Sequence, residues 1–302
     1  MAVAAAVHGG QLLLARWTHP WLACGPSRRR DRALRLTGLL ATAIVGGLGL
    51  ASLAALVLWS LAGPWRFPAS LPDAFTLESW RWAAHGLHGP LATSLALGLA
   101  SAAFALALTL ACLEHESRTP PRPTTRVIWL VYLPLLIPQL SFLFGLQVVL
   151  ITAGLDGTWP ALVWTHLVFV LPYVFLMLRG PYLALDPHYS SAARVLGRTE
   201  AWVFWRVKLP LLRRPVAVAA AVGITVSLAL YLPTLFAGGG RFATLTTETL
   251  ALAGSADRRL AATAGLVLAL TPLVALGLAG AVRPPAAVRA RSAAARLRAA
   301  GA

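Results

Sequence analysis

Long apolar stretches, separated by short polar segments, dominate the chain. Each stretch exceeds the roughly 20 residues that a helix needs to cross a bilayer. The stretches cover residues 36–61, 91–113, 127–152, 161–183, 215–237 and 261–282. The pattern predicts an all-α membrane protein with six transmembrane helices, whose membrane domain runs from residue 36 to residue 282.

Composition indicates a chain that faces lipid rather than water. Hydrophobic residues make up 58% of the 302 residues, and charged residues make up only 12%. A soluble domain carries about 25% charged residues, so a chain this poor in charge cannot cover a globular surface. The net charge is nevertheless +16, a surplus that also occurs in nucleic-acid-binding proteins.

The position of the charges explains the surplus. Twenty-one basic residues fall before the first stretch, between the second and third, at the end of the fourth or between it and the fifth, and after the sixth, whereas the other loops hold five. The ten acidic residues divide evenly between the two sets of segments. Basic loops stay on the cytoplasmic side, so we expect both tails, 1–35 and 283–302, in the cytoplasm and no nucleic-acid partner. The basic run 28–35 is a topology anchor or a partner site, and a basic tail also favours contact with membrane lipid.

The chain lacks the intramembrane charges and the nucleotide-binding motif with which it could power transport by itself. None of the stretches holds Asp, Glu, Lys or Arg deep inside, although ion-coupled transporters usually need such a group. His166 is the one ionisable side chain deep in a stretch. It relays protons or lines a path, or it is a neutral histidine hydrogen-bonded between helices. The single lysine, Lys208, precedes Leu209 and cannot form a nucleotide-binding P-loop. No HExxH or GxSxG motif predicts an enzyme, and no Cys/His spacing predicts a metal site.

The segment after the fourth stretch predicts a short amphipathic helix outside the bilayer. Asp186 is a good N-cap before Pro187, and Gly197 is a good C-terminal stop. A second short helix follows from Thr199. The apolar face of the first helix repeats at i, i+3, i+4 and i+7 and consists of Tyr189, Ala192, Ala193 and Leu196. Such a helix docks into a groove on a partner or lies on lipid, and its pattern alone fits both.

A spaced motif lies in the same segment. Two alanines, three residues, a glycine, nine residues and then Val-x-Leu-Pro follow in order, at Ala192, Ala193, Gly197, Val207, Leu209 and Pro210. This resembles the loop motif of ABC-transporter permease subunits: Glu-Ala-Ala, three residues, Gly, nine residues, Ile-x-Leu-Pro. The resemblance implies a coupling helix seated on an ATPase subunit. Ser191 stands where the family commonly has Glu, which removes a carboxylate that could bridge to the ATPase but leaves the packing contact.

The resemblance covers about residues 80–282 and implies the type I ABC importer permease fold. Segments 91–95, 133–139, 166–173 and 232–236 are also similar to the permease core. Three glycines at 238–240, followed by Thr-Leu-Thr-Thr at 244–247, look like an external loop of members that handle thiamine, ferric ion or related solutes.

The resemblance implies that several subunits share the transport function. The chain would form half of the translocation path in a bacterial inner membrane, and a second permease unit, identical or different, would form the rest. A dimer of ABC ATPase subunits would bind ATP and Mg²⁺, so the chain itself needs no cofactor, and a periplasmic binding protein would deliver solute. Candidate path residues are Gln139, His166, Tyr231 and Thr234; Gln139 is otherwise an interhelical polar contact. The residues alone leave two alternatives: a secondary transporter or channel that works without ATP, and a membrane scaffold that transports nothing.

Overall fold

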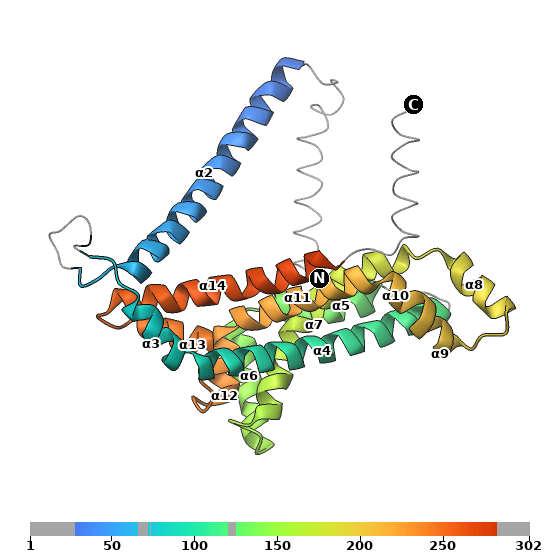
Figure 1. Cartoon of the computed structure of the whole chain (residues 1–302). Coiled ribbons are helices and arrows are strands. Elements are labelled where there is room, and N and C mark those ends of the chain that lie inside the picture. Colours follow the sequence, from blue (N-terminus) through green and yellow to red (C-terminus); the bar gives the residue numbers. More distant parts are fainter. Residues whose placement is uncertain (1–27, 66–71, 73, 120–124, 283–302) are drawn as a thin grey trace, which may run out of the picture. The chain divides into compact units, whose positions relative to one another are not determined.

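The structure of the chain, a computed structural model, describes residues 28–65, 72, 74–119 and 125–282 (Figure 1). Contacts between Cα atoms divide the chain into two units, Met1–Ala55 and Leu56–Ala302. The predicted tails lie outside the described residues, except for 28–35 at the start of the first helix.

One long helix accounts for the described part of the first unit. This helix, α2 (Arg28–Leu61), begins in the first unit and ends in the second. Its residues 35–55 are exposed, and most of them are apolar. An apolar helix surface of this length suits the interior of a bilayer.

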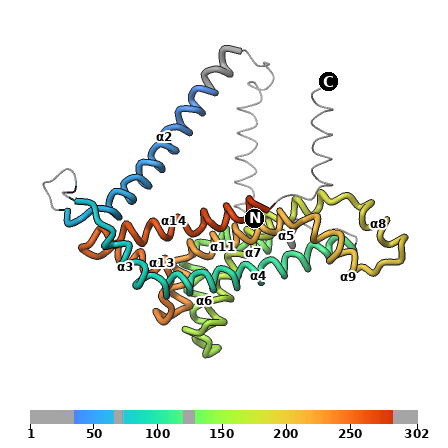
Figure 2. Tube along the Cα trace, viewed as in Figure 1, coloured from blue at the N-terminus to red at the C-terminus, as the bar shows by residue number. Residues whose placement is uncertain are grey.

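Three helices form the centre of the second unit (Figure 2). They are α4 (His88–Arg118), α7 (Trp159–Leu183) and α11 (Arg213–Ala229), which pack against one another. A fourth helix, α14 (Arg258–Ala281), packs against α11. The core shared by the first three includes Leu113, Val170, Val174, Leu178 and Ala219.

A glycine permits the close approach of these three helices. A Cβ atom at Gly223 of α11 would lie 3.0 Å from Cβ of Ala102 in α4 and 3.0 Å from Cγ2 of Val174 in α7. Small residues at helix crossings let backbones come together, which is how helices pack tightly in membranes.

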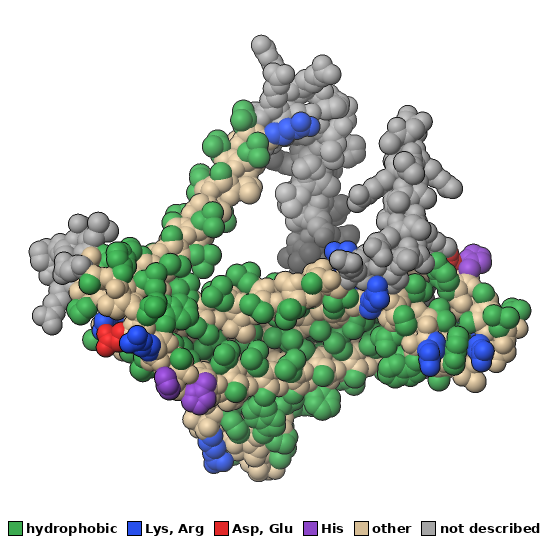
Figure 3. Space-filling view, viewed as in Figure 1, with side chains coloured by type: hydrophobic (Ala, Val, Ile, Leu, Met, Phe, Trp, Pro, Cys, Tyr) green, Lys and Arg blue, Asp and Glu red, His purple; other side chains and the backbone are tan. Residues whose placement is uncertain are grey.

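Four helices among the described residues are long and apolar enough to cross a membrane: α2, α4, α7 and α14. They correspond to the first, second, fourth and sixth predicted stretches. Two bent pairs of helices raise the number to six if each pair is one span. Hydrophobic side chains are spread over the described helices in Figure 3, as expected for helices in lipid, whereas charged side chains are few on this face.

The third predicted stretch, 127–152, is not one straight helix. It divides into α5 (Thr125–Leu136) and α6 (Gln139–Thr152), which are bent by 105°. Pro138 leaves the helical region, with φ −52° and ψ 122°. Proline has no N–H to donate to the carbonyl of Pro134, and its ring would crowd that carbonyl, so the helix ends there.

The fifth predicted stretch, 215–237, also divides. After α11 ends at Ala229, Leu230 turns out of the helix with ψ 91°, and α12 (Tyr231–Gly238) begins. In a continuous helix the ring of Pro233 would clash with the carbonyl of Ala229, which explains the break. The helical segment Glu200–Leu211 meets α11 at a bend of 76°.

Short helices adjoin the first turns of α4 and α14. They are α3 (Glu78–Gly86) and α13 (Leu245–Ala253), and their shared core holds Ala83, Leu87, Leu245 and Ala264. An isolated antiparallel bridge joins Ala62 and Phe75. Asp257 caps α14 by accepting a hydrogen bond from the N–H of Arg259 at 3.0 Å. Hydrogen bonds from the Arg259 guanidinium hold the pKa of the Asp257 carboxyl below its usual value.

Candidate functional site

The segment between α7 and α11, residues 184–212, is called here the α7–α11 loop. It contains α8 (Pro187–Val195), α9 (Glu200–Val203), the π-helix η1 (Phe204–Lys208) and α10 (Leu209–Leu211). Asp186 caps α8, since its Oδ1 accepts a hydrogen bond from the N–H of His188 at 3.0 Å. Thr199 caps α9 by accepting from the N–H of Trp202 at 3.3 Å. Both helices predicted for this segment are confirmed.

Gly197 ends α8 as predicted. Its φ of +74° lies in the left-handed region, where glycine avoids the clash that a Cβ would cause. The N–H of Arg198 donates to the carbonyl of Ala193 at 3.1 Å, and the N–H of Gly197 donates to that of Arg194 at 2.8 Å. This pair of bonds is a Schellman motif, which satisfies the last carbonyls of the helix.

The predicted apolar face of α8 divides into two parts. Ala193 is buried and Tyr189 is half-buried, so these two side chains face the rest of the protein. Leu196, in contrast, is 78% exposed, and its neighbour Val195 is 87% exposed. Ser191 and Ala192 are exposed as well. The loop therefore presents an uncovered aliphatic pair at the end of a helix whose other side is anchored.

The second half of the motif adopts a π-helix. The N–H of Leu209 donates to the carbonyl of Phe204, five residues earlier. Pro210, the next residue, has no N–H to offer, and the wider turn relieves the crowding that its ring would cause in an α-helix. Single π-turns are rare and occur often at functional sites. Within this turn Val207 is half-buried and Lys208 is buried.

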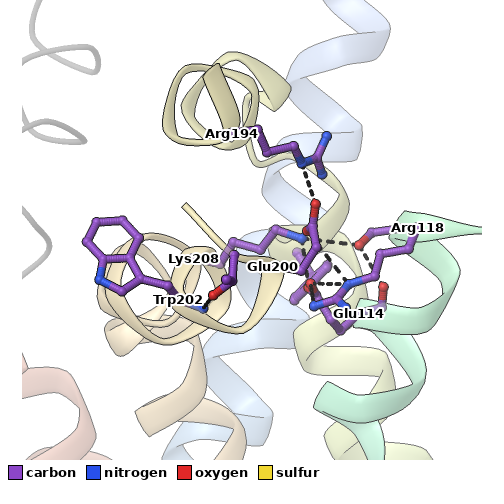
Figure 4. Close-up of polar contacts among 9 residues, drawn as sticks. Glu114, Arg118, Arg194, Glu200, Trp202 and Lys208 are labelled. Atoms are coloured by element: carbon purple, nitrogen blue, oxygen red, sulfur yellow. Dashed lines mark hydrogen bonds and ion pairs between the residues drawn. The ribbon is translucent and has the colours of Figure 1, made fainter. Parts of the chain in front are cut away.

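Lys208 forms a buried ion pair with Glu114, near the end of α4 (Figure 4). Its Nζ lies 2.7 Å from Oε2 of Glu114 and 3.2 Å from Oγ of Ser117. The hydroxyl of Tyr182, in α7, donates to the same Oε2. Arg118 donates to Oε1 from Nε at 2.8 Å. Glu114 is 8% exposed and Lys208 is 7% exposed, so one carboxylate joins three elements away from water.

An outer chain of ion pairs extends this cluster to α8 (Figure 4). Nε of Arg118 lies 3.9 Å from Oε2 of Glu200, at the start of α9. The other oxygen of Glu200 lies 2.6 Å from Nε of Arg194, in α8. These side chains are partly exposed, so each outer pair contributes little to stability by itself. Together they align α8, α9 and the end of α4.

A polar pocket of about 260 Å³ lies between α8 and this cluster. Ser191 lines it together with Arg194 and Lys208. The pocket also borders Glu116, whose Oε1 lies 3.1 Å from Nη2 of Arg179 in α7. Glu114 and Glu116 of α4 thus place two carboxylates near Lys208.

His166 and Thr234, two of the predicted path residues, lie together in a buried polar group. Nε2 of His166 lies 3.0 Å from Oγ1 of Thr234, and Nδ1 lies 2.8 Å from Oγ of Ser227. The group joins α7, α11 and α12, and the space among its members is too small for a water molecule. This geometry fits the interhelical role that the sequence left open for His166, and a part in the path stays a prediction.

Gln139 and Tyr231, the other predicted path residues, both stand where a helix resumes after a break. Gln139 opens α6 and Tyr231 opens α12, and each is half-buried. The two helices pack on each other, with the rings of Phe144 and Phe236 in edge contact at 5.2 Å. The structure thus brings the two breaks into one region, while the lining of a path stays a prediction.

Two curated proteins are similar to the chain in sequence. The chain is 39% identical over 188 residues to the inner membrane ABC transporter permease protein YnjC of Escherichia coli, covering 62% of this chain and 35% of that protein. It is 27% identical over 215 residues to the probable ABC transporter permease protein y4fN of Sinorhizobium fredii, covering 65% of this chain and 37% of that protein. These relatives support membership of the ABC transporter permease family. No family model matches the chain. The chain spans about a third of the length of these two permeases.

A solved structure supports the permease fold. The crystal structure of a bacterial ABC transporter involved in the import of the acidic polysaccharide alginate contains a similar chain, with a TM-score of 0.53 and 11% identity. The similarity covers 83% of this chain and 96% of that one. At this identity the likeness concerns the fold alone.

The sequence pattern does not identify the buried ion pair that anchors the α7–α11 loop. Glu114 lies within α4, which runs five residues beyond the predicted stretch, and its partners Tyr182 and Lys208 lie 68 and 94 residues away in sequence. One signal was present, because Lys208 is the single lysine beside a loop rich in arginine. Pairing it with Glu114 required the helix packing, which the spacing of residues does not encode.

Proposed function

We propose that the chain is a permease subunit of an ATP-driven ABC importer and forms half of a translocation path. The observation that carries this proposal is the exposed end of α8, where Val195 and Leu196 face solvent from a helix anchored on its other side. Exposed apolar patches on an ordered element mark interaction sites. The loop motif, the permease relatives and the fold support the same function, and they favour a transport subunit over an enzyme.

The proposed partner at α8 is an ABC ATPase subunit, one of two, which would bind ATP and Mg²⁺. A second permease unit would complete the path, and a periplasmic binding protein would deliver the solute. The charge pattern supports placing the α7–α11 loop and both tails on the cytoplasmic side of a bacterial inner membrane. The proposed solute is thiamine, ferric ion or a related small solute, which is supported by the likeness of residues 238–247 to the external loop of such importers.

Replacing Leu196 with Glu, or Val195 with Glu, tests the docking role. A carboxylate in an apolar contact is costly to bury, so we expect at least a tenfold loss of the ABC ATPase subunit that co-purifies with the chain from its own host membranes. The measurement is the ATPase-to-permease ratio in lipid nanodiscs. Leu77→Glu, at an equally apolar exposed position beside α3, is the matched control and should leave the ratio unchanged.

Two outcomes would contradict the proposal. Unchanged retention of the ATPase in both loop variants would remove α8 from the interface. Solute uptake that continues after ATP depletion, with the membrane potential clamped, would favour a secondary transporter or channel instead.

A further inference from the structure

One carboxylate ties the α7–α11 loop to two long helices. Glu114 belongs to α4, Tyr182 to α7 and Lys208 to η1, and all three meet at Oε2 of Glu114. Arg118 occupies the other oxygen, with Nε at 2.8 Å and Nη2 at 2.7 Å. The carboxylate therefore has donors on both oxygens, as a buried charge requires.

The ion pair has features that a surface anchor would not need. Both charged groups are almost fully buried, and removing two charges from water is costly even when they pair. A well-packed apolar pair could hold the same elements at least as firmly. The lysine also stands in a π-turn, immediately before the Leu-Pro that ends the loop motif. Directional bonds fix the relative position of the three elements in a way that apolar contacts do not.

The neighbouring contacts connect this cluster to α8 on one side and to the length of α4 and α7 on the other. On one side, Glu200 links Arg118 to Arg194 of α8, so α8 and the end of α4 share a charged chain. On the other side, α4 and α7 pack along their length and carry most of the central core. Displacement of the loop would thus reach α4 and α7 through Lys208 and Glu114.

We propose that Lys208 and Glu114, with Tyr182, form the joint that transmits movement of the α7–α11 loop to α4 and α7. This inference rests on the proposed function, because the movement would come from the ATPase subunits seated on α8. Lys208 and Glu114 are positioning residues: they contact neither solute nor nucleotide, and they act by keeping loop and helices in one moving body.

The decisive variant is Lys208→Met in the complex of the full chain with its ATPase subunits, in lipid nanodiscs. Methionine fills nearly the same volume, and Glu114 keeps Arg118 and Tyr182, so the loop retains its fold. The readout is amide hydrogen exchange in α4 and α7, compared before and after trapping with Mg-ATP and vanadate. We expect the trapping-induced change to fall at least fivefold, while ATPase retention and basal ATP hydrolysis stay within twofold of wild type.

Further variants separate transmission from simple support. Lys208→Arg keeps the charge and should retain at least half of the response. Tyr182→Phe removes one donor from the same oxygen and should lose about half of the response. Arg259→Gln, at the start of α14, removes a local and more exposed ion pair with Asp257, away from the α7–α11 loop, and should change nothing in this readout.

The outcomes distinguish the inference from the function on which it rests. A Lys208→Met complex that responds like wild type would overturn the inference alone. Loss of the ATPase from both Lys208→Met and Tyr182→Phe would also overturn it, because the cluster would then only support the docking surface. A wild-type chain that retains no ATPase would overturn the proposed function, and the inference would fall with it.

Discussion

His166 makes two hydrogen bonds whose directions follow from a count of protons. The Thr234 hydroxyl also contacts the carbonyl of Leu230 at 2.6 Å, which can only accept. Its one proton is therefore used there, and Thr234 must accept from Nε2–H of His166. A neutral imidazole has one N–H, so Nδ1 accepts from the hydroxyl of Ser227. The histidine thus connects α7 to both sides of the helix break at Leu230.

Thr234→Val tests this assignment at the scale of one residue. Valine keeps the shape but leaves the buried Nε2–H without an acceptor, which costs about 1–3 kcal/mol in the free energy of unfolding. Thr42→Val is the matched control, because its hydroxyl is exposed and bonds to the carbonyl of Gly38 in its own helix. Denaturant unfolding of the two variants in detergent measures the difference. Equal losses would mean that the histidine network contributes nothing.

Residue identities alone predicted part of this picture. The sequence placed His166 deep in a helix and offered an interhelical hydrogen bond as one of its roles. It did not identify Ser227 or Thr234 as partners, since they lie 61 and 68 residues later. The same separation hid the contact between Glu114 and Lys208. Local rules assign caps and stops, whereas a buried polar partner depends on which helices pack together.

At the scale of an element, neighbouring residues determine where α8 begins and ends, but they do not determine what the helix contacts. Asp186 begins it and Gly197 ends it, both as the sequence predicts. The breaks in the third and fifth stretches were less predictable. A proline such as Pro138 or Pro233 interrupts a helix, but the bend of 105° between α5 and α6 depends on what each half packs against. Apolar length alone predicts a span without saying whether it is straight.

Gly197→Ala should loosen α8. An alanine at φ +74° pays the left-handed penalty of about 1–2 kcal/mol, which corresponds to roughly 5- to 30-fold faster amide exchange over residues 187–203. Gly277→Ala, near the C-terminal end of α14 with open space around it, should instead be neutral or stabilise that helix. Hydrogen exchange detected by mass spectrometry compares both. If amide exchange in α8 is as slow in Gly197→Ala as in the unchanged chain, the backbone at residue 197 is not strained by the alanine side chain.

At the scale of the whole molecule, charge and apolar length carry most of the information that the sequence offered. Four long helices coincide with predicted stretches, because 20 or more apolar residues have few alternatives to a bilayer span. The placement of 21 basic residues on one set of segments predicts a single orientation. Neither charge nor apolar length predicts how the chain assembles with other chains, because a helix face that contacts a partner is apolar like one that contacts lipid.

The predicted orientation can be tested with cysteines. In a background with Cys24→Ser and Cys112→Ser, and without the ATPase subunits proposed to cover it, Leu196→Cys should react with a membrane-impermeant maleimide only when the reagent is inside. Ser255→Cys, in the exposed turn between α13 and α14, should react only when it is outside. Because basic loops remain cytoplasmic, we expect at least a tenfold preference in each case. Reversed labelling would contradict the charge argument.

The burial of Lys208 also gives the chain an unusual chemical property. A lysine side chain reacts with acylating reagents only when it meets solvent, and here it is buried against Glu114. Since no other lysine is present, acylation of side-chain amines has one possible target. The rate of that single reaction therefore reports how often the contact between loop and helix opens, and it does so without a label or an added mutation.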